Sequence, residues 1–312
     1  MQLPIFPHGR LIGPAAIACA AALMPTAASA ATAGSPASQA GQAHPVTVYV
    51  ANSGSDTVTP INTATNTAGK PITVGKRPDS IAITPDGKTA YVTNFFSNTV
   101  TPIQTATDKV LKPITVGSQP DFIAITPNGK TAYVINGGSG NTGPATITPI
   151  RTATNTAGKP IAVGGYGAYP DAIAITPNGK TAYVTVPGDV YAAPGLVVPI
   201  QTATGTAGKA IMVGKFPGAI AITPNGTTAY VADASGVTPI NAATKTAGQP
   251  ITGVSGPIAI TPDGTTAYAV SGPDTVTPID AAANKAGKAI KVGSAPVAIA
   301  ITPPATRPTR SR

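Results

Sequence analysis

The sequence DSIAITPDGKTAYVTNFFSNTVTPIQTATDKVLKPITV, from Asp79 to Val116, recurs with variations from about Val46 to Pro303. Self-similarity at a period of roughly 40 residues is typical of repeat proteins, in which each unit is one supersecondary structure. The 312 residues therefore predict one large repetitive domain. Gly and Pro number 34 each and Glu is absent, which favours strands and turns over helices.

Each unit contains four short runs of β-forming residues, separated by turn residues. We name them a, b, c and d; in one unit they span Phe122 to Thr126, Thr131 to Asn136, Ala145 to Ile150 and Pro160 to Val163. Runs a and b are joined by Pro-Asp-Gly or Pro-Asn-Gly, in which Pro presets φ and Gly takes the positive φ that closes a hairpin. These turns begin at Pro85, Pro127, Pro177, Pro224 and Pro262.

Three of the runs occur six times each. The b runs are led by Tyr49, Tyr91, Tyr133, Tyr183, Tyr230 and Tyr268. The c runs carry Pro-Ile at Pro60, Pro102, Pro149, Pro199, Pro239 and Pro278. The a runs lie at Ile81, Ile123, Ile173, Ile220, Ile258 and Ile299. The repeat region therefore opens on a b run and ends on an a run.

This offset predicts a closed ring. If the last a run, Val297 to Thr302, pairs with the first b run, Thr47 to Ala51, the two ends complete one sheet and no open edge remains. A solenoid would need distinct capping repeats, and the sequence contains none. We expect an all-β propeller of four-stranded blades over residues 45–303, with six blades as the simplest count and seven as the alternative.

Tyr91-Val92-Thr93-Asn94 follows Ile-Ala-Ile-Thr-Pro-Asp-Gly-Lys-Thr-Ala and precedes Thr-Val-x-x-Ile-x-Thr-Ala-Thr. In this pattern, which covers roughly residues 46–303, the chain resembles the YVTN family of β-propeller repeat proteins. The resemblance implies a propeller, commonly of seven blades, found among exported or surface-layer proteins and distantly similar to lactonase-type and haem-d1 propellers. It does not specify a chemistry.

Two features depart from that family's pattern. The chain has six units, and every c run carries Pro where the family usually has an apolar β-former. Because Pro removes a ladder donor, we expect it at a non-bonding position facing strand d, or at a bulge. Alternation within Ile-Ala-Ile places the two Ile toward one neighbouring blade, and we expect the six repeated Tyr to pack between blades.

Residues 1–30 have the pattern of a secretory signal. Arg10 ends a short n-region, Leu11 to Met24 is apolar but too short to span a bilayer, and Ala28-Ser29-Ala30 suits signal peptidase. We expect cleavage after Ala30 and a secreted or cell-surface protein. Cys19, the single cysteine, is either a lipid acceptor or an apolar residue of the removed leader, and we favour the latter.

Two segments flank the predicted propeller. Residues 31–44 are rich in Ala, Ser and Gly and predict a disordered tether, and residues 304–312 predict a basic disordered tail. No later stretch is apolar enough to span a membrane. The net charge of +9 suits an anionic environment such as wall polymer, lipid headgroups or nucleic acid.

The composition argues against common catalytic sites. Both histidines, His8 and His44, precede the propeller, which also lacks Glu and Cys. A Ser-His-Asp triad, a His metal cluster or a haem-ligating His therefore cannot form within it. We expect no enzymatic activity and no resident cofactor, with a lactonase- or lyase-like enzyme as the alternative.

Aromatic residues outside the repeat pattern concentrate in the loops that precede strands a and c. Those loops are lengthened at Gly137 to Pro144, Gly165 to Tyr169 and Pro187 to Pro194. Such aromatics stack sugar rings or anchor a protein partner, or they simply cover the ends of blades. The candidate ligand-binding residues are Phe95, Phe96, Phe122, Tyr166, Tyr169, Tyr191 and Phe216.

Three aspartates, Asp79, Asp121 and Asp171, follow Pro just before or at the start of strand a. On one interpretation they form half a ring of carboxylates that holds Ca²⁺. On the other, which we favour, they cap turns through their backbones, because later units carry Gly218 and Val297 at this position.

Lysines gather in the turns of the opposite face. They form either a binding surface for an anionic polymer or a solvated rim, and nucleic acid is disfavoured because no aromatics are interleaved with them. The candidates are Lys70, Lys88, Lys112, Lys130, Lys159, Lys180, Lys209 and Lys288.

Together these features predict an exported, monomeric, non-enzymatic binding or scaffold protein. We expect its loop-rich aromatic face to recognise a glycan, wall polymer or protein. The alternatives are an enzyme with a cation at the Asp-lined channel mouth, and a binder of anionic polymer or nucleic acid through the lysines.

Overall fold

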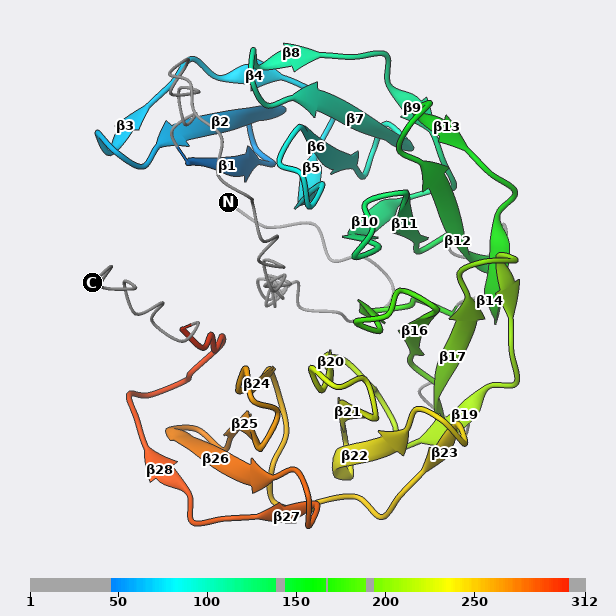
Figure 1. Ribbon diagram of the computed structural model, residues 1–312, viewed down its shortest axis with the longest axis vertical. Coiled ribbons are helices and arrows are strands. Elements are labelled where there is room, and N and C mark those ends of the chain that lie inside the picture. Colours follow the sequence, from blue (N-terminus) through cyan, green and yellow to red (C-terminus); the bar gives the residue numbers. More distant parts are fainter. Residues whose placement is uncertain (1–45, 139–143, 167, 189–193, 303–312) are drawn as a thin grey trace, which may run out of the picture.

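A computed structural model describes residues 46–138, 144–166, 168–188 and 194–302. The described residues form strands and turns, and no helix among them is long and apolar enough to cross a membrane. The strands make six antiparallel sheets, and Figure 1 shows these sheets following one another around an arc. The all-β prediction is therefore confirmed.

The first three sheets are built from 14 strands. Sheet 1 contains β1 (Thr47–Asn52), β2 (Thr57–Asn62), β3 (Thr67–Ala68) and β4 (Ile72–Thr73). Sheet 2 contains β5 (Pro78–Ile83), β6 (Thr89–Asn94), β7 (Thr99–Gln104), β8 (Lys109–Val110) and β9 (Ile114–Thr115). Sheet 3 contains β10 (Pro120–Ile125), β11 (Thr131–Asn136), β12 (Pro144–Arg151), β13 (Thr156–Ala157) and β14 (Ile161–Tyr166).

The other three sheets repeat this plan. Sheet 4 contains β15 (Ile173–Ile175), β16 (Thr181–Val186), β17 (Gly195–Gln201), β18 (Thr206–Ala207) and β19 (Ile211–Val213). Sheet 5 contains β20 (Ile220–Ile222), β21 (Thr228–Asp233), β22 (Gly236–Asn241) and β23 (Thr246–Ala247). Sheet 6 contains β24 (Ile258–Ile260), β25 (Thr266–Ser271), β26 (Thr275–Asp280), β27 (Lys285–Ala286) and β28 (Ile290–Lys291).

The repeated prolines explain why the outer strand d is split. In sheet 1, β3 and β4 both pair with β2, and residues 69–71 stand opposite only Thr59 and Pro60. This is a one-residue bulge, and the same shift recurs in the other five sheets. Each proline therefore faces strand d at a bulge, as predicted. At this position the ladder does not need a hydrogen bond from the N–H that proline lacks.

The bulge also fixes the residue that faces the proline. The carbonyl oxygen of each of the six prolines accepts a bond from an outer-strand N–H at 2.7–2.9 Å. In five sheets that N–H belongs to glycine, and a Cβ there would lie 3.0–3.3 Å from the proline ring, which is crowded. Leu111 takes this place in sheet 2.

Neighbouring sheets pack face to face through the tyrosines of strand b. Tyr91 of sheet 2 is buried against Ile123 and Val134 of sheet 3, and Tyr133 is buried against Ile173 and Val184 of sheet 4. The predicted packing role is confirmed. The hydroxyl groups reach further than predicted, because five of the six donate to a backbone carbonyl oxygen in the c-to-d turn of the next sheet. These bonds run from Tyr49, Tyr91, Tyr133, Tyr183 and Tyr230 to Thr105, Thr152, Thr202, Ala242 and Ala281.

Asn94, which ends the Tyr-Val-Thr-Asn sequence, ties strands β6 and β7 to the d-to-a corner before them. Its Oδ1 accepts from the N–H of Gly75 in the preceding sheet at 3.1 Å, and its Nδ2 donates to Oγ1 of Thr101 at 2.8 Å. A Cβ at Gly75 would lie 2.6 Å from the Asn94 side chain, so glycine makes room for it. The sequence motif is therefore a junction between sheets, with no ligand-binding role required.

The predicted closing pair is not present. Residues 297–302 form no strand, and β1 pairs with β2 alone among the described residues. Figure 1 shows an opening between sheet 1 and sheet 6. The sequence specifies which faces pack, but the angle between successive sheets depends on the bulk of the packed side chains, and here six sheets span only part of a circle. Val48 and Val50 of β1 are consequently exposed.

Loss of one inter-sheet hydroxyl tests this packing. Tyr133→Phe removes the bond to the Thr202 carbonyl oxygen at 3.2 Å and should lower the free energy of unfolding. The expected loss is about 1 kcal/mol, the usual net value of one buried hydrogen bond. Urea denaturation followed by circular dichroism measures it.

Tyr268→Phe is the matched control, because Tyr268 is half-buried and makes no hydrogen bond within the described residues. It should leave the stability unchanged. An equal loss in the two variants would contradict the open arrangement, since Tyr268 would then need a sheet beyond it.

Candidate functional site

The loops form two separate faces. The b-to-c turns and the d-to-a corners together make one, which we call the loop face. They are joined by backbone bonds such as Phe95 N–H to the Arg77 carbonyl oxygen at 2.9 Å and Gly137 N–H to that of Gln119 at 3.1 Å. The a-to-b and c-to-d turns make the other, the lysine rim, where Thr105 N–H donates to the Lys88 carbonyl oxygen at 3.1 Å. The predicted division of the loops is therefore confirmed.

Each d-to-a corner contains a residue followed by proline, and at five of the six corners this residue has a positive φ, Tyr169 being the exception. Arg77, Gln119, Phe216 and Ala295 have φ between 50° and 54°, in the left-handed region that L residues rarely adopt. At two corners the N–H is bound by the previous sheet's turn: Asp56 Oδ1 accepts from Arg77 at 2.8 Å, and Asn98 Oδ1 accepts from Gln119 at 2.9 Å. We missed this feature in the sequence, where a proline at every corner was its only signal.

An aromatic and cationic cluster lies on the loop face of sheet 2. The Phe95 and Phe96 rings meet edge to face, with centroids 5.2 Å apart. The guanidinium carbon of Arg77 lies 4.2 Å from the Phe95 centroid and 5.2 Å from that of Phe96, within range of a cation–π interaction. Phe96 remains 63% exposed. The structure thus brings together two predicted residues and adds a third.

The other predicted aromatics have different surroundings. Phe216 is 51% exposed and Tyr169 is 37% exposed, both beside a corner proline on the loop face. Phe122 is half-buried and packs against the core between sheets 3 and 4, so it is not part of the exposed set. Tyr191 and the Tyr166 side chain lie outside the described residues.

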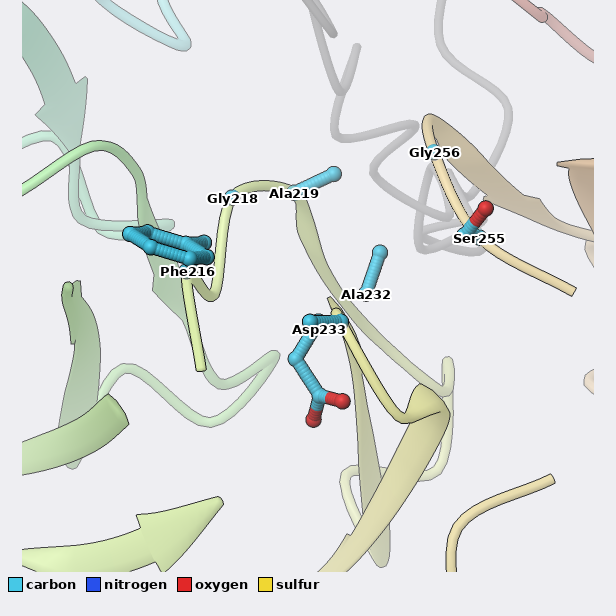
Figure 2. A pocket seen from close by; sticks show the side chains of 8 residues that line it. Phe216, Gly218, Ala219, Ala232, Asp233, Ser255 and Gly256 are labelled. Carbon is cyan, nitrogen blue, oxygen red and sulfur yellow. The ribbon is translucent and has the colours of Figure 1, made fainter. Parts of the chain in front are cut away.

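A hollow of about 270 Å³ lies on the loop face between sheets 5 and 6. Figure 2 shows Phe216 on one side of it and Ser255 with Gly256 on the other. Its remaining lining residues are mostly small: Gly218, Ala219, Ala232, Asp233 and Ala234. Two successive corners, at Phe216 and Gly256, therefore border one hollow.

The carboxylate in this hollow is already used by the fold. Asp233 is 4% exposed, and its oxygens accept from Ser235 N–H at 2.7 Å, Gly214 N–H at 3.0 Å and Thr238 Oγ1 at 2.6 Å. It occupies the position that Asn94 occupies in sheet 2. Because both oxygens are bonded, Asp233 is poorly placed to act as an acid or base.

The three aspartates proposed for calcium are not gathered into a cluster. No group of three His, Cys, Asp or Glu side chains within the described ranges is placed to hold a metal ion. Asp79 Oδ2 lies 3.7 Å from Arg77 Nε, and Asp121 and Asp171 each take part in interactions of their own. Burial raises the pKa of Asp79, and the charge of Arg77 partly offsets this.

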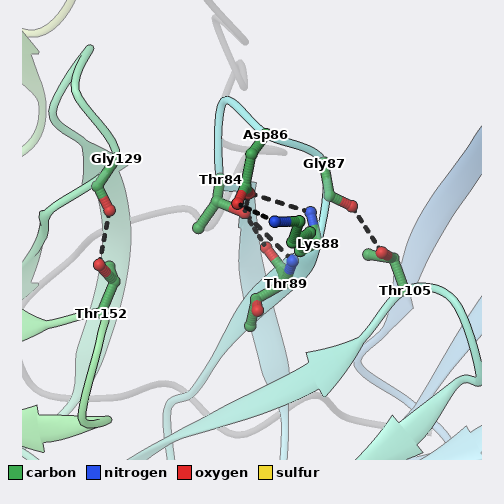
Figure 3. A network of polar contacts seen from close by, with 8 residues as sticks. All are labelled: Thr84, Asp86, Gly87, Lys88, Thr89, Thr105, Gly129 and Thr152. Carbon is green, nitrogen blue, oxygen red and sulfur yellow. Dashed lines mark hydrogen bonds and ion pairs between the residues drawn. The ribbon is translucent and has the colours of Figure 1, made fainter.

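All eight candidate lysines of the rim are exposed. Figure 3 shows the turn that presents Lys88: Thr84 Oγ1 donates to Asp86 Oδ1 at 2.6 Å, and Asp86 accepts from Lys88 N–H at 3.1 Å. These two bonds hold the pKa of Asp86 below its usual value. The turns are thus built by local hydrogen bonds, and the lysine ammonium groups extend into solvent, which suits both a binding surface and a solvated rim.

Comparison with known proteins identifies the fold class. The family model described as "YNCE-like beta-propeller" matches residues 10–133. The Kuenenia stuttgartiensis hydrazine synthase structure has 23% identity and a TM-score of 0.63, covering 81% of this chain and 85% of that one. The structure of dihydro-heme d1 dehydrogenase NirN in complex with DHE has 16% identity and a TM-score of 0.65, covering 83% of this chain and 56% of that one. No curated protein matches the sequence.

The chain is therefore a β-propeller protein. At these identities the two solved structures show the fold and nothing of the chemistry. Both are similar over about four-fifths of this chain.

Asp79→Asn tests the electrostatics of the loop face. Because burial raises the pKa of Asp79, the folded state binds its proton more tightly than the unfolded state does, and the charged form is a cost at neutral pH. The melting temperature of the variant should equal or exceed that of the unsubstituted chain at pH 7. The difference should vanish near pH 3, below the ordinary aspartate pKa of about 3.9.

A lower melting temperature at pH 7 would mean that the Arg77 ion pair outweighs burial. The same scans with calcium test the cation hypothesis: a rise in the unsubstituted chain that Asp79→Asn lacks would support a calcium site there.

Proposed function

We propose that this protein is a non-enzymatic β-propeller that binds a glycan, wall polymer or protein through its loop face. The observation that carries this proposal is the exposure of Phe96, Tyr169 and Phe216 at turns and corners of that one face. Exposed large aromatics on rigid loops are typical of recognition surfaces, because they supply contact area at a low cost in conformational entropy.

The available polar groups favour binding over catalysis. The chain has no Glu, and both of its histidines precede the described strands. The buried carboxylate of the hollow, Asp233, is fully hydrogen-bonded, and Asp79 is paired with Arg77. General acid–base catalysis needs a group within reach of substrate whose proton is free to move, and neither carboxylate meets that condition.

The proposal extends to the architecture and the location. We propose that the six sheets are the blades of a six-bladed YVTN-type propeller that acts as a monomer. We propose further that residues 1–30 direct export and are removed near Ala30, which leaves the loop face available to an extracellular polymer. The signal-like sequence and the repeated Tyr-Val motif support this.

A pull-down with isolated bacterial cell walls tests the function. The full chain is compared with a triple variant, Phe96→Ser, Tyr169→Ser and Phe216→Ser, and with a rim variant, Lys130→Ser, Lys180→Ser and Lys209→Ser. We expect the loop-face variant to lose at least tenfold in affinity, and the rim variant to bind like the unsubstituted chain.

The dependence of binding on salt concentration distinguishes the loop face from the lysine rim. Binding through uncharged stacking should change little between 50 mM and 500 mM NaCl, whereas contacts from several lysines to an anionic polymer should weaken steeply. Binding that is lost in the rim variant and at high salt would replace the loop-face proposal with the anionic-polymer alternative.

A further inference from the structure

We propose that the residue before proline at each d-to-a corner is the position at which this propeller sets its ligand specificity. We propose that Arg77, Gln119, Tyr169 and Phe216 select a polymer of uncharged pyranose sugars. This inference rests on the proposed binding role of the loop face and names its substrate class.

Four of the six corners share one backbone conformation while their side chains differ. Arg77, Gln119, Phe216 and Ala295 share φ values within 4° of one another. Tyr169 precedes Pro170 at the same place in its repeat, and Gly256 precedes Pro257 with a φ of 103°. One shared backbone conformation thus presents an arginine, a glutamine or a phenylalanine at the same face, and Tyr169 takes the same place in its repeat without a positive φ.

The fold alone does not explain these side chains. A positive φ is unfavourable for any L residue, a following proline restricts it further, and glycine relieves the steric conflict. Glycine at position 256 and alanine at position 295 show that the corner forms without a large side chain. A residue other than glycine therefore carries backbone strain at this corner, and the large side chains of Arg77, Gln119 and Phe216 are not needed to form it.

Phe216 is exposed at its corner, and Arg77 and Gln119 are partly exposed at theirs. Arg77 lies against Phe95 and beside the exposed Phe96. Phe216 is half-exposed and forms one wall of the hollow in Figure 2, and the opposite wall includes the next corner, Gly256.

The chemistry of this set fits sugar rings. The electron-rich faces of Phe96, Tyr169 and Phe216 suit the C–H faces of pyranoses, and the arginine and glutamine offer planar donors to hydroxyl groups. The exposed aromatics belong to different turns and corners of different sheets, whereas a protein partner favours one continuous apolar patch.

Charge on the loop face favours an uncharged polymer. The cations next to the corners, Lys76, Arg77 and Lys215, are matched on the same turns and corners by carboxylates. Those carboxylates belong to Asp56, Asp79, Asp121, Asp171 and Asp233. An acidic saccharide would therefore gain little net attraction here.

Glycine substitutions test the inference without threatening the fold. Arg77→Gly, Gln119→Gly and Phe216→Gly each remove a side chain and relieve the positive φ, so the melting temperature should stay equal or rise. Ala295→Gly is the matched control, with the same backbone change and almost no side chain lost. The probes are insoluble cellulose, chitin and β-1,3-glucan, with polygalacturonate gel as the anionic comparison.

We expect the unsubstituted chain and Ala295→Gly to bind at least one uncharged polymer equally well. The triple glycine variant should bind it at least tenfold more weakly, and Arg77→Gly and Phe216→Gly should differ in which polymer they lose most.

Three results would overturn the inference. Unchanged binding in the triple variant would remove the corners from recognition while leaving the proposed function intact. A lower melting temperature in the triple variant would show that the side chains are structural. Retention on polygalacturonate alone, or on none of the four probes, would reject the substrate class, and the cell-wall assay would then decide the proposed function separately.

Discussion

The burial of one sheet against the next is the interaction on which the rest of this structure depends. A single sheet of short strands has no hydrophobic core of its own. Its apolar faces are buried only when neighbouring sheets pack against them. The strand-b tyrosines fill these interfaces and donate a hydrogen bond to the following sheet's turn. Burial raises the pKa of Tyr91 to about 12, so this hydroxyl keeps its proton at physiological pH.

Inter-sheet contacts also fix the loop face. Asn94 reaches Gly75 of the preceding sheet, and Asp56 binds the backbone of Arg77. The corners are thereby held in one conformation although the side chains on them differ. A rigid backbone with variable side chains suits binding, because little conformational entropy is lost when a ligand docks. The lysine rim is also held by contacts between sheets, through the tyrosine hydroxyls that bond its c-to-d turns, and hydrogen bonds within each turn complete it.

The resemblance to enzyme structures concerns the fold. Propellers of one architecture perform unrelated tasks, since function depends on groups added to the loops. In this chain the carboxylates nearest the loop face are engaged: Asp79 with Arg77, and Asp233 with Gly214, Ser235 and Thr238. What the loop face has in addition is exposed aromatic surface, which supports recognition.

The sequence by itself determined the strands, the turns and the faces that pack, because these depend on local spacing: Pro-Asp-Gly turns, alternating Ile-Ala-Ile and one tyrosine per unit. It also predicted the bulge at the prolines of strand c, because a residue without an N–H fits few other positions in a sheet. It did not determine the opening between β1 and β28, which depends on the angle accumulated over all the sheets. Nor did it determine the positive φ of Arg77 or its stacking on Phe95, because Asp56, Phe95 and Arg77 meet only when separate turns pack together.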